Sequence, residues 1–240
     1  MILQDKTAIV TGASRGIGFA FSRALVERGA LVFGIARNQA DLLEADERLG
    51  PHFHGMQCDV TEPAQVEHVF DLIESEAGRV DVLVNNAGVG LHRQVDEVTD
   101  EEWSRLLETN LTGIFNCTRS VVPMMKRQNE ITGFGGHILN IASVAGLVGN
   151  PGLSAYNATK YGVRGFSDAL MKELRYDGIK VTCVYPGSVQ TSFFEDMGDI
   201  EAHEGMLQPK DVAATLIHCL ELPDNCLISD VVIRVLRPRR

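Results

Sequence analysis

The segment YNATK, residues 156–160, places a phenol and an ammonium group four positions apart. Residues at positions i and i+4 share one face of a helix, so Tyr156 and Lys160 would be neighbours. A nearby positive charge favours phenolate, and we therefore expect Lys160 to lower the pKa of Tyr156 from its ordinary value of about 10. A tyrosine with such a pKa can serve as general acid and base between a carbonyl and an alcohol. The alternative is a surface helix that carries one aromatic and one charged residue.

Ser143 follows an apolar run, residues 138–141, that is typical of a buried strand. Ligands of open parallel sheets bind past the carboxyl ends of the strands, so a serine here faces the crevice. We expect Ser143 to hold the substrate oxygen by a hydrogen bond and Tyr156 to transfer the proton. The hydride would pass between the carbonyl carbon and a nicotinamide that lies across residues 86–88. A turn serine is the alternative. No glycine-flanked elbow surrounds Ser143, which disfavours a hydrolase nucleophile.

The elements that must position these residues are indicated by an alternation along the chain. Short runs rich in valine and isoleucine alternate with longer helical patterns, and several runs lack the polar alternation of half-exposed strands. This predicts one open parallel sheet with helices on both sides, in a single domain over residues 1–240. The expected strands are 7–10, 31–35, 54–58, 82–84, 137–141, 181–185 and 231–235, and the expected helices lie near 17–28, 38–49, 63–76, 100–127, 155–177 and 211–221.

Length and composition predict a soluble globular protein. The chain has 240 residues, of which 45% are apolar and 22% charged. No apolar run approaches the roughly 20 residues that cross a bilayer, and the N-terminus lacks the pattern of a secretory signal, so we expect a cytoplasmic location. The net charge of −10 disfavours a nucleic-acid-binding surface. The five cysteines form no CxxC pair, and we expect reduced, mostly buried thiols.

Three glycines, Gly12, Gly16 and Gly18, follow the first expected strand and open a helix. Glycines at such a turn let backbone N–H groups approach a pyrophosphate at the helix N-terminus. The spacing is GxxxGxG and not the commoner GxGxxG. The alternative is a tight turn that only allows close packing of the helix on the sheet.

The end of the second expected strand indicates which dinucleotide would bind. NAD-dependent enzymes usually carry an acidic residue there for the ribose 2′-hydroxyl, whereas this chain has Ala36 and Arg37. Arg37 and Arg15 suit a 2′-phosphate by charge and by forked hydrogen bonding, which favours NADP(H); the alternative is two solvated arginines. Asp41 lies a turn into the next helix and is discounted as a ribose ligand. Asp59 ends the third strand, where it would either accept from adenine or cap the next helix.

Seven segments occur in order between residues 11 and 191: TGASRGIG, DVT, NNAG, ETNLTGIF, ILNIASVAG, YNATK and YPGSVQT. Each is a weak motif alone, but in this order and spacing they resemble the short-chain dehydrogenase/reductase family. The resemblance implies a Rossmann-type fold, with a doubly wound parallel seven-stranded sheet and helices on both faces. It also implies an NADP-dependent oxidoreductase that interconverts a carbonyl and a secondary alcohol.

The resemblance further assigns site residues. It implies a catalytic tetrad of Asn110, Ser143, Tyr156 and Lys160. In the family this asparagine distorts its helix and holds a water that connects to the lysine, so that the tyrosine proton is resupplied through a ribose hydroxyl, the lysine and water. The residues implied to contact the cofactor are Gly12, Ser14, Arg15, Gly16, Ile17, Gly18, Arg37, Asp59, Val60, Asn86, Ala87, Gly88, Tyr156, Lys160, Pro186, Gly187, Val189 and Thr191.

Family members are commonly dimers or tetramers built through the long helices, and we expect a homodimer or homotetramer. Members that reduce acyl-carrier-protein thioesters usually carry a glycine-rich segment before the last strand, whereas residues 222–240 read LPDNCLISDVVIRVLRPRR. This stretch resembles members acting on small hydroxy acids or amino alcohols, and 3-oxoacyl-(acyl-carrier-protein) reductase is the alternative. A non-catalytic dinucleotide-binding regulatory protein is an alternative of another class, disfavoured because Ser143, Tyr156 and Lys160 are all retained.

Three stretches, 89–96, 144–153 and 192–206, are expected to line a substrate pocket. Their apolar side chains are Leu91, Val144, Leu147, Val148, Leu153, Phe193, Phe194, Met197 and Met206. A lid at about 190–208, with an acidic part at 195–204, is expected to become ordered when ligand binds. His92 and Arg93 would steer an anionic substrate, although a solvated loop is favoured. His52 and His54 lack a third ligand, so no metal is expected. The basic tail, residues 237–240, is expected to be solvated or to clamp a partner subunit.

Overall fold

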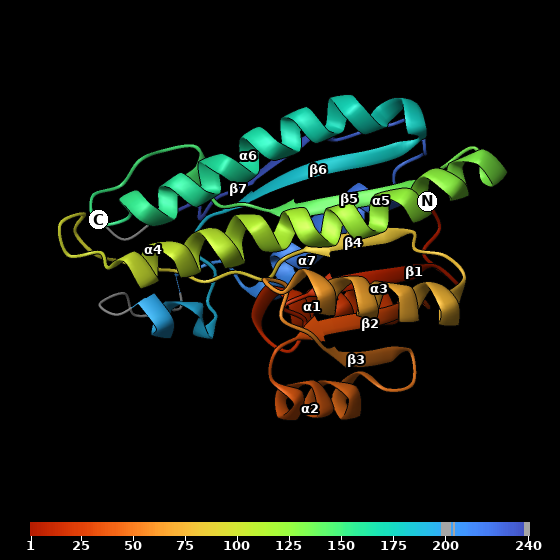
Figure 1. Cartoon of the computed structure of the whole chain (residues 1–240), viewed down its shortest axis with the longest axis horizontal. Helices are drawn as coiled ribbons and strands as arrows, with labels where there is room; N and C mark the ends of the chain where they lie inside the picture. Colours follow the sequence, from red (N-terminus) through yellow and green to blue (C-terminus); the bar gives the residue numbers. More distant parts are fainter. Residues whose placement is uncertain (198–202, 204, 238–240) are drawn as a thin grey trace.

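One parallel sheet of seven strands runs through the part of the chain that the computed structural model describes, residues 1–197, 203 and 205–237 without the side chains of 194–196. The strand order is β3-β2-β1-β4-β5-β6-β7 (Figure 1). The strands are β1 (Thr7–Thr11), β2 (Leu31–Ala36), β3 (Phe53–Gln57), β4 (Val82–Asn85), β5 (Gly136–Ile141), β6 (Ile179–Pro186) and β7 (Asp230–Ile233). The order reverses between β1 and β4, and such a switch point opens a crevice past the carboxyl ends of the strands.

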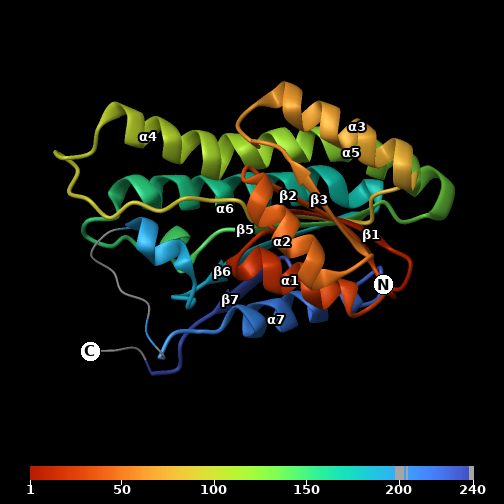
Figure 2. The same ribbon diagram turned by 90° about the horizontal axis from the view of Figure 1, so that it is seen from below.

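Helices cover both faces of this sheet (Figures 1 and 2). The first layer contains α1 (Gly16–Val26), α2 (Gln39–Leu49) and α7 (Pro209–Glu221), and the second contains α3 (Pro63–Ala77), α5 (Gly113–Thr132) and α6 (Ser154–Leu174). Successive strand side chains point to opposite faces, so Val10 packs with Phe21 under the first layer while Ile9 packs with Phe70 under the second. Burial on both faces explains the continuous apolar strand sequences.

The long helix expected at 100–127 is interrupted. α4 (Asp100–Leu107) begins at a capping box in which Thr99 Oγ1 accepts from the Glu102 N–H, and the Glu102 carboxylate accepts from the Thr99 N–H. A π-helical turn, η1 (Glu108–Thr112), then joins α4 to α5. Such turns are frequent at functional sites, and this one contains Asn110. The helix distortion implied for Asn110 is therefore confirmed, and the helical segment expected near 100–127 continues beyond it as α5 to Thr132.

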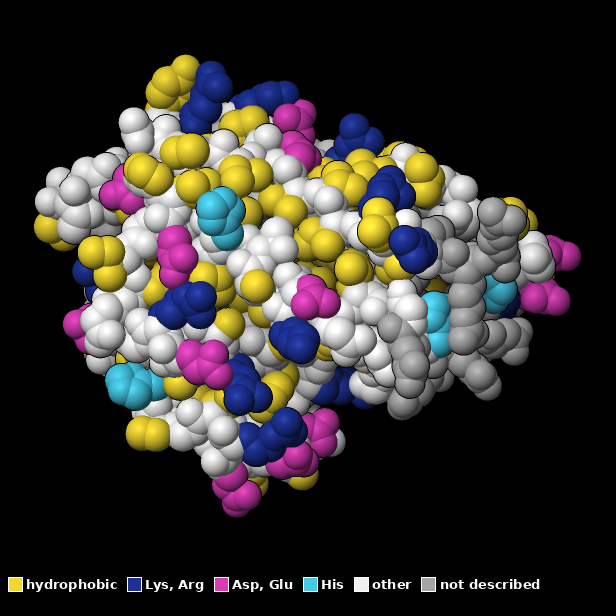
Figure 3. Space-filling view, turned by 180° about the vertical axis from the view of Figure 1, so that it is seen from behind, with side chains coloured by type: hydrophobic (Ala, Val, Ile, Leu, Met, Phe, Trp, Pro, Cys, Tyr) yellow, Lys and Arg dark blue, Asp and Glu magenta, His cyan; other side chains and the backbone are white. Residues whose placement is uncertain are grey.

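The remaining elements agree with the predicted alternation to within about two residues at most ends. The helix expected at 155–177 ends earlier, at Leu174, and a 3-10 turn then leads to Gly178 in the left-handed region at φ 63°. The cysteines are free and mostly buried, as predicted: Cys58, Cys117, Cys183 and Cys219 are buried, and Cys226 is exposed. No helix in the described part of the chain is both long and apolar enough to cross a membrane. Acidic and basic side chains are interspersed with apolar ones on the face seen in Figure 3.

Two predicted segments are described only in part. Within the expected lid, residues 192–197 form a 3-10 turn, η4 (Ser192–Met197), whereas 198–202 and 204 lie outside the described residues. The acidic part of the lid, 195–204, and the Phe194 side chain therefore fall almost wholly outside them. Of the basic tail, only Arg237 is described, and it is exposed.

Candidate active site

A cleft of about 850 Å³ opens at the carboxyl edge of the sheet and gathers most of the predicted site residues. Those that line it are Gly12, Ser14, Arg15, Gly16, Ile17, Arg37, Asp59, Val60, Asn86, Ala87, Gly88, Ser143, Tyr156, Lys160, Pro186, Gly187, Val189 and Thr191. The other two predicted residues, Gly18 and Asn110, are not part of the lining and support it from behind. Residues that are more than 170 positions apart in the sequence therefore share one cavity.

The glycine turn after β1 is shaped by close approach and by backbone conformation. Gly12 and Gly16 lie in the left-handed region, at φ 64° and 58°, where side chains are disfavoured. A Cβ atom on Gly18 would stand 2.1 Å from the carbonyl oxygen of Gly12. Gly18 therefore lets the first turn of α1 pack directly on the turn that precedes it, which was the structural alternative for this motif.

The N-terminus of α1 also offers an anion site within the cleft. Its N-cap residue, Arg15, makes no side-chain capping hydrogen bond, and no acidic residue lies in the first turn. The N-terminal N–H groups and the helix dipole favour a negatively charged group there. Arg15 and Arg37 both line this end of the cleft. This donor set fits the phosphates of a dinucleotide, including a 2′-phosphate.

Asn86 has a structural task that its sequence context did not indicate. Its Nδ2 donates to the carbonyls of Thr11, at 2.9 Å, and Gly12, at 3.2 Å. In return, Thr11 Oγ1 accepts from the N–H groups of Asn86, at 2.9 Å, and Ala87, at 3.0 Å. Thr11 and Asn86 thus join the ends of β1 and β4, and Thr11 is a positioning residue that sequence reasoning missed. A polar residue at the end of a buried strand was the available signal.

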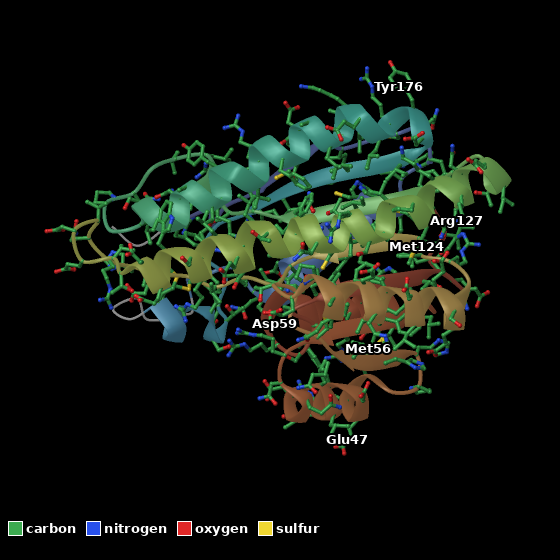
Figure 4. The ribbon with its side chains drawn as sticks, in the orientation of Figure 1. Glu47, Met56, Asp59, Met124, Arg127 and Tyr176 are labelled. Atoms are coloured by element: carbon green, nitrogen blue, oxygen red, sulfur yellow. The ribbon has the colours of Figure 1, made fainter. Side chains whose placement is uncertain are left out.

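Two acidic residues, Asp41 and Asp59, line the end of the cleft that lies past β2 and β3. Asp59 follows the carboxyl end of β3, and Figure 4 shows it together with Met56, which lies on that strand. Its Oδ1 accepts from the N–H of Thr61, at 3.0 Å, and from its hydroxyl, at 2.9 Å, while Glu62 is the N-cap of α3. Asp59 therefore stabilises the turn before α3 and does not cap the helix itself. Asp41 also lines the cleft, where its carboxylate accepts from Asn38 Nδ2 at 2.9 Å.

Tyr156, Lys160 and Ser143 meet at the other end. Tyr156 and Lys160 lie in the first two turns of α6 and are 7% and 5% exposed. Lys160 Nζ stands 5.7 Å from the centroid of the Tyr156 ring and donates to the carbonyl of Ile141 at 3.0 Å. Ser143 lies beside the Tyr156 hydroxyl, whose pKa it lowers, and its Oγ accepts from the N–H of Ala145 at 3.1 Å.

The electrostatics of this trio differ from the prediction. Burial raises the pKa of Tyr156 to about 12, against the smaller lowering effect of the Ser143 hydrogen bond. Burial also lowers the pKa of Lys160 to about 8. The predicted lowering of the tyrosine pKa by Lys160 is therefore wrong for this structure. Desolvation of the phenolate dominates, and the ammonium group of Lys160 donates to the Ile141 carbonyl.

Asn110 connects the π-helical turn to this trio. Its Oδ1 accepts from the N–H of Val89 at 2.8 Å, and its Nδ2 donates to the Val89 carbonyl at 2.9 Å and to Thr159 Oγ1 at 3.2 Å. A Cβ atom on Gly88 would lie 3.2 Å from Asn110 Oδ1 and 3.7 Å from Lys160 Nζ. Asn110 thus fixes the loop after β4 against α6, beside the lysine.

The predicted substrate residues divide between the cleft and its surroundings. Val144, Leu153, Phe193 and Met197 line the cleft, and the Phe193 ring lies 6.1 Å from that of Tyr156, centroid to centroid. Leu91 and Met206 are buried outside the lining, Leu147 packs against a neighbouring cluster and Val148 is exposed. Asn150 and Ser192, which lie in the stretches expected to line the pocket, also line the cleft, whereas sequence reasoning missed Thr109 and Ser188.

The remaining charged candidates have local partners. Arg93 pairs with Glu102 at 3.3 Å, which supports an ion-paired loop and not a steering role. His54 lies 3.6 Å from the carboxylate of Glu76. Within the described ranges, no three His, Cys, Asp or Glu side chains are grouped as metal ligands would be.

A parallel sheet with a glycine turn after its first strand, and a serine, a tyrosine and a lysine in the crevice, defines a dinucleotide-binding oxidoreductase of the Rossmann type. The comparison with known families gives the narrower assignment. The sequence profile described as "short chain dehydrogenase" matches residues 6–201, and the chain belongs to this family.

Two relatives and one solved structure illustrate what the chain is similar to. The 3-oxoacyl-(acyl-carrier-protein) reductase of Vibrio cholerae is 35% identical over 98% of this chain and 97% of its own length. The enzyme of the same description from Escherichia coli K12 is 40% identical over 83% of this chain and 80% of its own length. The closed form of a serine dehydrogenase complexed with NADP+ superposes with a TM-score of 0.90 at 31% identity, covering 97% and 96% of the two chains.

Proposed function

We propose that this protein is an NADP(H)-dependent oxidoreductase that interconverts a carbonyl and a secondary alcohol, with Tyr156 as general acid and base. The observation that carries the proposal is the meeting of Ser143, Tyr156 and Lys160 in the same cleft as the glycine turn, Arg15 and Arg37. The NADP+ in the similar serine dehydrogenase structure supports the choice of cofactor.

The cofactor would be held by the α1 N-terminus and the two arginines, with Gly88, Pro186 and Gly187 at the reacting end. When bound, NADPH supplies the hydride that reduces the carbonyl carbon. The remaining chemistry is proton transfer and orientation by the chain's own residues.

The Ser143 Oγ accepts the Ala145 N–H, which orients its hydroxyl, and this hydroxyl donates to the substrate oxygen when substrate is bound. Tyr156 is protonated at neutral pH, since its pKa is raised to about 12, and it therefore acts as the acid when a carbonyl is reduced. Lys160, whose pKa is lowered to about 8, is mostly charged at neutral pH and stabilises the phenolate that Tyr156 becomes.

The substitution Tyr156→Phe tests this assignment, because it removes the transferable proton and little volume. We expect kcat to fall by about 10²–10⁴-fold, the usual contribution of a general acid. NADPH binding, measured by fluorescence titration, should stay within about twofold of the wild type. Wild-type turnover by the variant would show that Tyr156 is not the acid.

A second candidate, 3-oxoacyl-(acyl-carrier-protein) reductase, is favoured by the two relatives of that description. The similarity to a serine dehydrogenase favours a small hydroxylated substrate instead. NADPH oxidation, followed by absorbance, should be measured with ketones, aldehydes, keto acids and 3-oxoacyl thioesters, and NADP+ reduction with hydroxy acids and amino alcohols. A kcat/KM for the thioester well above those of the free carbonyls would select the reductase.

We also propose that the enzyme acts in the cytoplasm as a homodimer or homotetramer. Exposed apolar side chains on α4, α5 and α6 support an assembly through these helices. Trp103 on α4, Phe115 on α5 and Tyr161 on α6 are 42%, 45% and 42% exposed. Light scattering coupled to size exclusion tests this proposal, and a mass of one chain at micromolar concentration would reject it.

A further inference from the structure

Asn157, the neighbour of Tyr156 in the sequence, uses its whole side chain to hold one wall of the cleft. It is buried, with 7% of its surface exposed. Its Nδ2 donates to the carbonyl of Ala145, at 2.5 Å, and to that of Val148, at 2.8 Å. Its Oδ1 accepts from the N–H of Asn150 at 3.3 Å. Three hydrogen bonds thus join α6 to residues 145–150.

The segment that Asn157 holds lies just after Ser143, the serine of the site. Ser143, Val144, Ala145 and Asn150 all line the cleft. Ala145 takes part in both sets of contacts, because its N–H donates to Ser143 Oγ at 3.1 Å while its carbonyl accepts from Asn157. A displacement of Ala145 would therefore move the Ser143 hydroxyl relative to Tyr156.

The same turn lies against the backbone of α6. A Cβ atom on Gly146 would stand 2.7 Å from the carbonyl oxygen of Lys160, so the turn and the helix are in direct contact. Asn157 is one turn before Lys160 on that helix. The turn at residues 144–146 itself offers only backbone groups and small or apolar side chains. Asn157 supplies the polar side-chain contacts that fix this turn to α6.

We propose that Asn157 is a positioning and specificity-determining residue of this enzyme. It fixes the Ser143 hydroxyl against Tyr156 and sets the place of the wall formed by Val144, Ala145 and Asn150. The proposal rests on the proposed oxidoreductase function. Misplacement of a reacting group by about 1 Å can cost about 100-fold in rate, so a clamp of this kind acts on kcat as well as on substrate preference.

Gln128 provides a matched control. Its side chain also makes three hydrogen bonds to backbone, donating to the carbonyls of Val80, at 2.9 Å, and Gly135, at 2.8 Å, and accepting from the N–H of Val80 at 2.7 Å. It joins α5 to the segments that precede β4 and β5, at the amino edge of the sheet, and it is not part of the cleft lining. Gln128→Ala therefore removes an equivalent set of contacts far from the site.

The experiment compares Asn157→Ala, Asn157→Asp and Gln128→Ala with the wild type. The measurements are kcat and KM for two wild-type substrates of different size, the Kd of NADPH and the Tm. The aspartate side chain keeps the shape of asparagine and the acceptor oxygen for the Asn150 N–H, but it lacks the amide group that donates to the carbonyls of Ala145 and Val148. We expect both Asn157 variants to lose about tenfold to 100-fold in kcat and to change the ratio of kcat/KM between the two substrates, with NADPH affinity within about twofold of the wild type. Gln128→Ala should lower Tm but leave kcat and the ratio unchanged.

Two results would overturn the inference alone. One is an Asn157→Asp variant with wild-type kcat and substrate ratio, because the donors would then be dispensable. The other is a Gln128→Ala variant that loses as much kcat as Asn157→Ala at a similar loss of Tm, because the effect would then be one of stability. A wild-type protein that turns over no substrate in the panel would instead overturn the proposed function, and this inference with it.

Discussion

His137 gives a quantitative prediction about the stability of this fold in acid. It lies in β5 and is completely buried. Its Nε2 is 2.8 Å from Thr182 Oγ1, which itself donates to the carbonyl of Ile228 at 2.6 Å, so Nε2 must be the protonated nitrogen. Nδ1 has no partner among the described residues. A second proton at Nδ1 would therefore be buried without an acceptor.

The pKa of His137 is lowered from 6.5 to about 3, first by burial and then by the charges of Lys180, its register partner on β6, and of the Met1 ammonium group. Between these two values the unfolded chain binds a proton that the folded chain does not. The free energy of unfolding therefore falls as the pH decreases through this window. The slope reaches about 1.4 kcal/mol per pH unit, and this single group removes about 3 kcal/mol between pH 7 and pH 4.

Urea unfolding followed by circular dichroism at intervals from pH 7 to pH 4 measures this effect. His137→Gln keeps an N–H donor towards Thr182 but does not titrate. We expect this variant to be less stable than the wild type at pH 7 and to lose about 3 kcal/mol less than the wild type on going to pH 4. His68→Gln, at an exposed position of α3, is the control and should follow the wild-type curve. Parallel curves for the wild type and His137→Gln would refute the reasoning.

Two further predictions concern the cleft. Arg37→Ala should weaken NADPH binding by about tenfold to 100-fold, because the lost charge-assisted hydrogen bonds to the 2′-phosphate are each worth about 1.5–3 kcal/mol. NADH binding should stay within about twofold of the wild type, and fluorescence titration measures both affinities. A wild-type enzyme that prefers NADH would contradict the role of Arg37. Because the pKa of Lys160 is lowered to about 8, its charge is present below that pH and is lost above it. The kcat/KM for carbonyl reduction should accordingly fall by about tenfold per pH unit above pH 8, and a flat profile up to pH 9.5 would argue against Lys160 as the group that stabilises the phenolate.

The sequence by itself determined the architecture. Valine- and isoleucine-rich runs without polar alternation must be buried on both faces, and helical patterns between them supply the cover, so a doubly wound parallel sheet follows. It also determined the contents of the cleft. Parallel strands end at the same edge, so Arg37, Gly88 and Ser143, which follow three different strands, line one cavity. Pro186, Gly187, Val189 and Thr191 line it too, but only the family resemblance implied them.

Only the tertiary structure decided how these residues interact. Spacing places Tyr156 and Lys160 on one helix face, but the pKa of Tyr156 depends on how many other elements exclude water from it, and that burial reversed the predicted direction. In the same way, Asn86 turns to the carbonyls of β1, and Asn157 turns to the segment after β5. Periodicity along one element cannot reveal contacts between elements, because these depend on the distances and packing that folding creates.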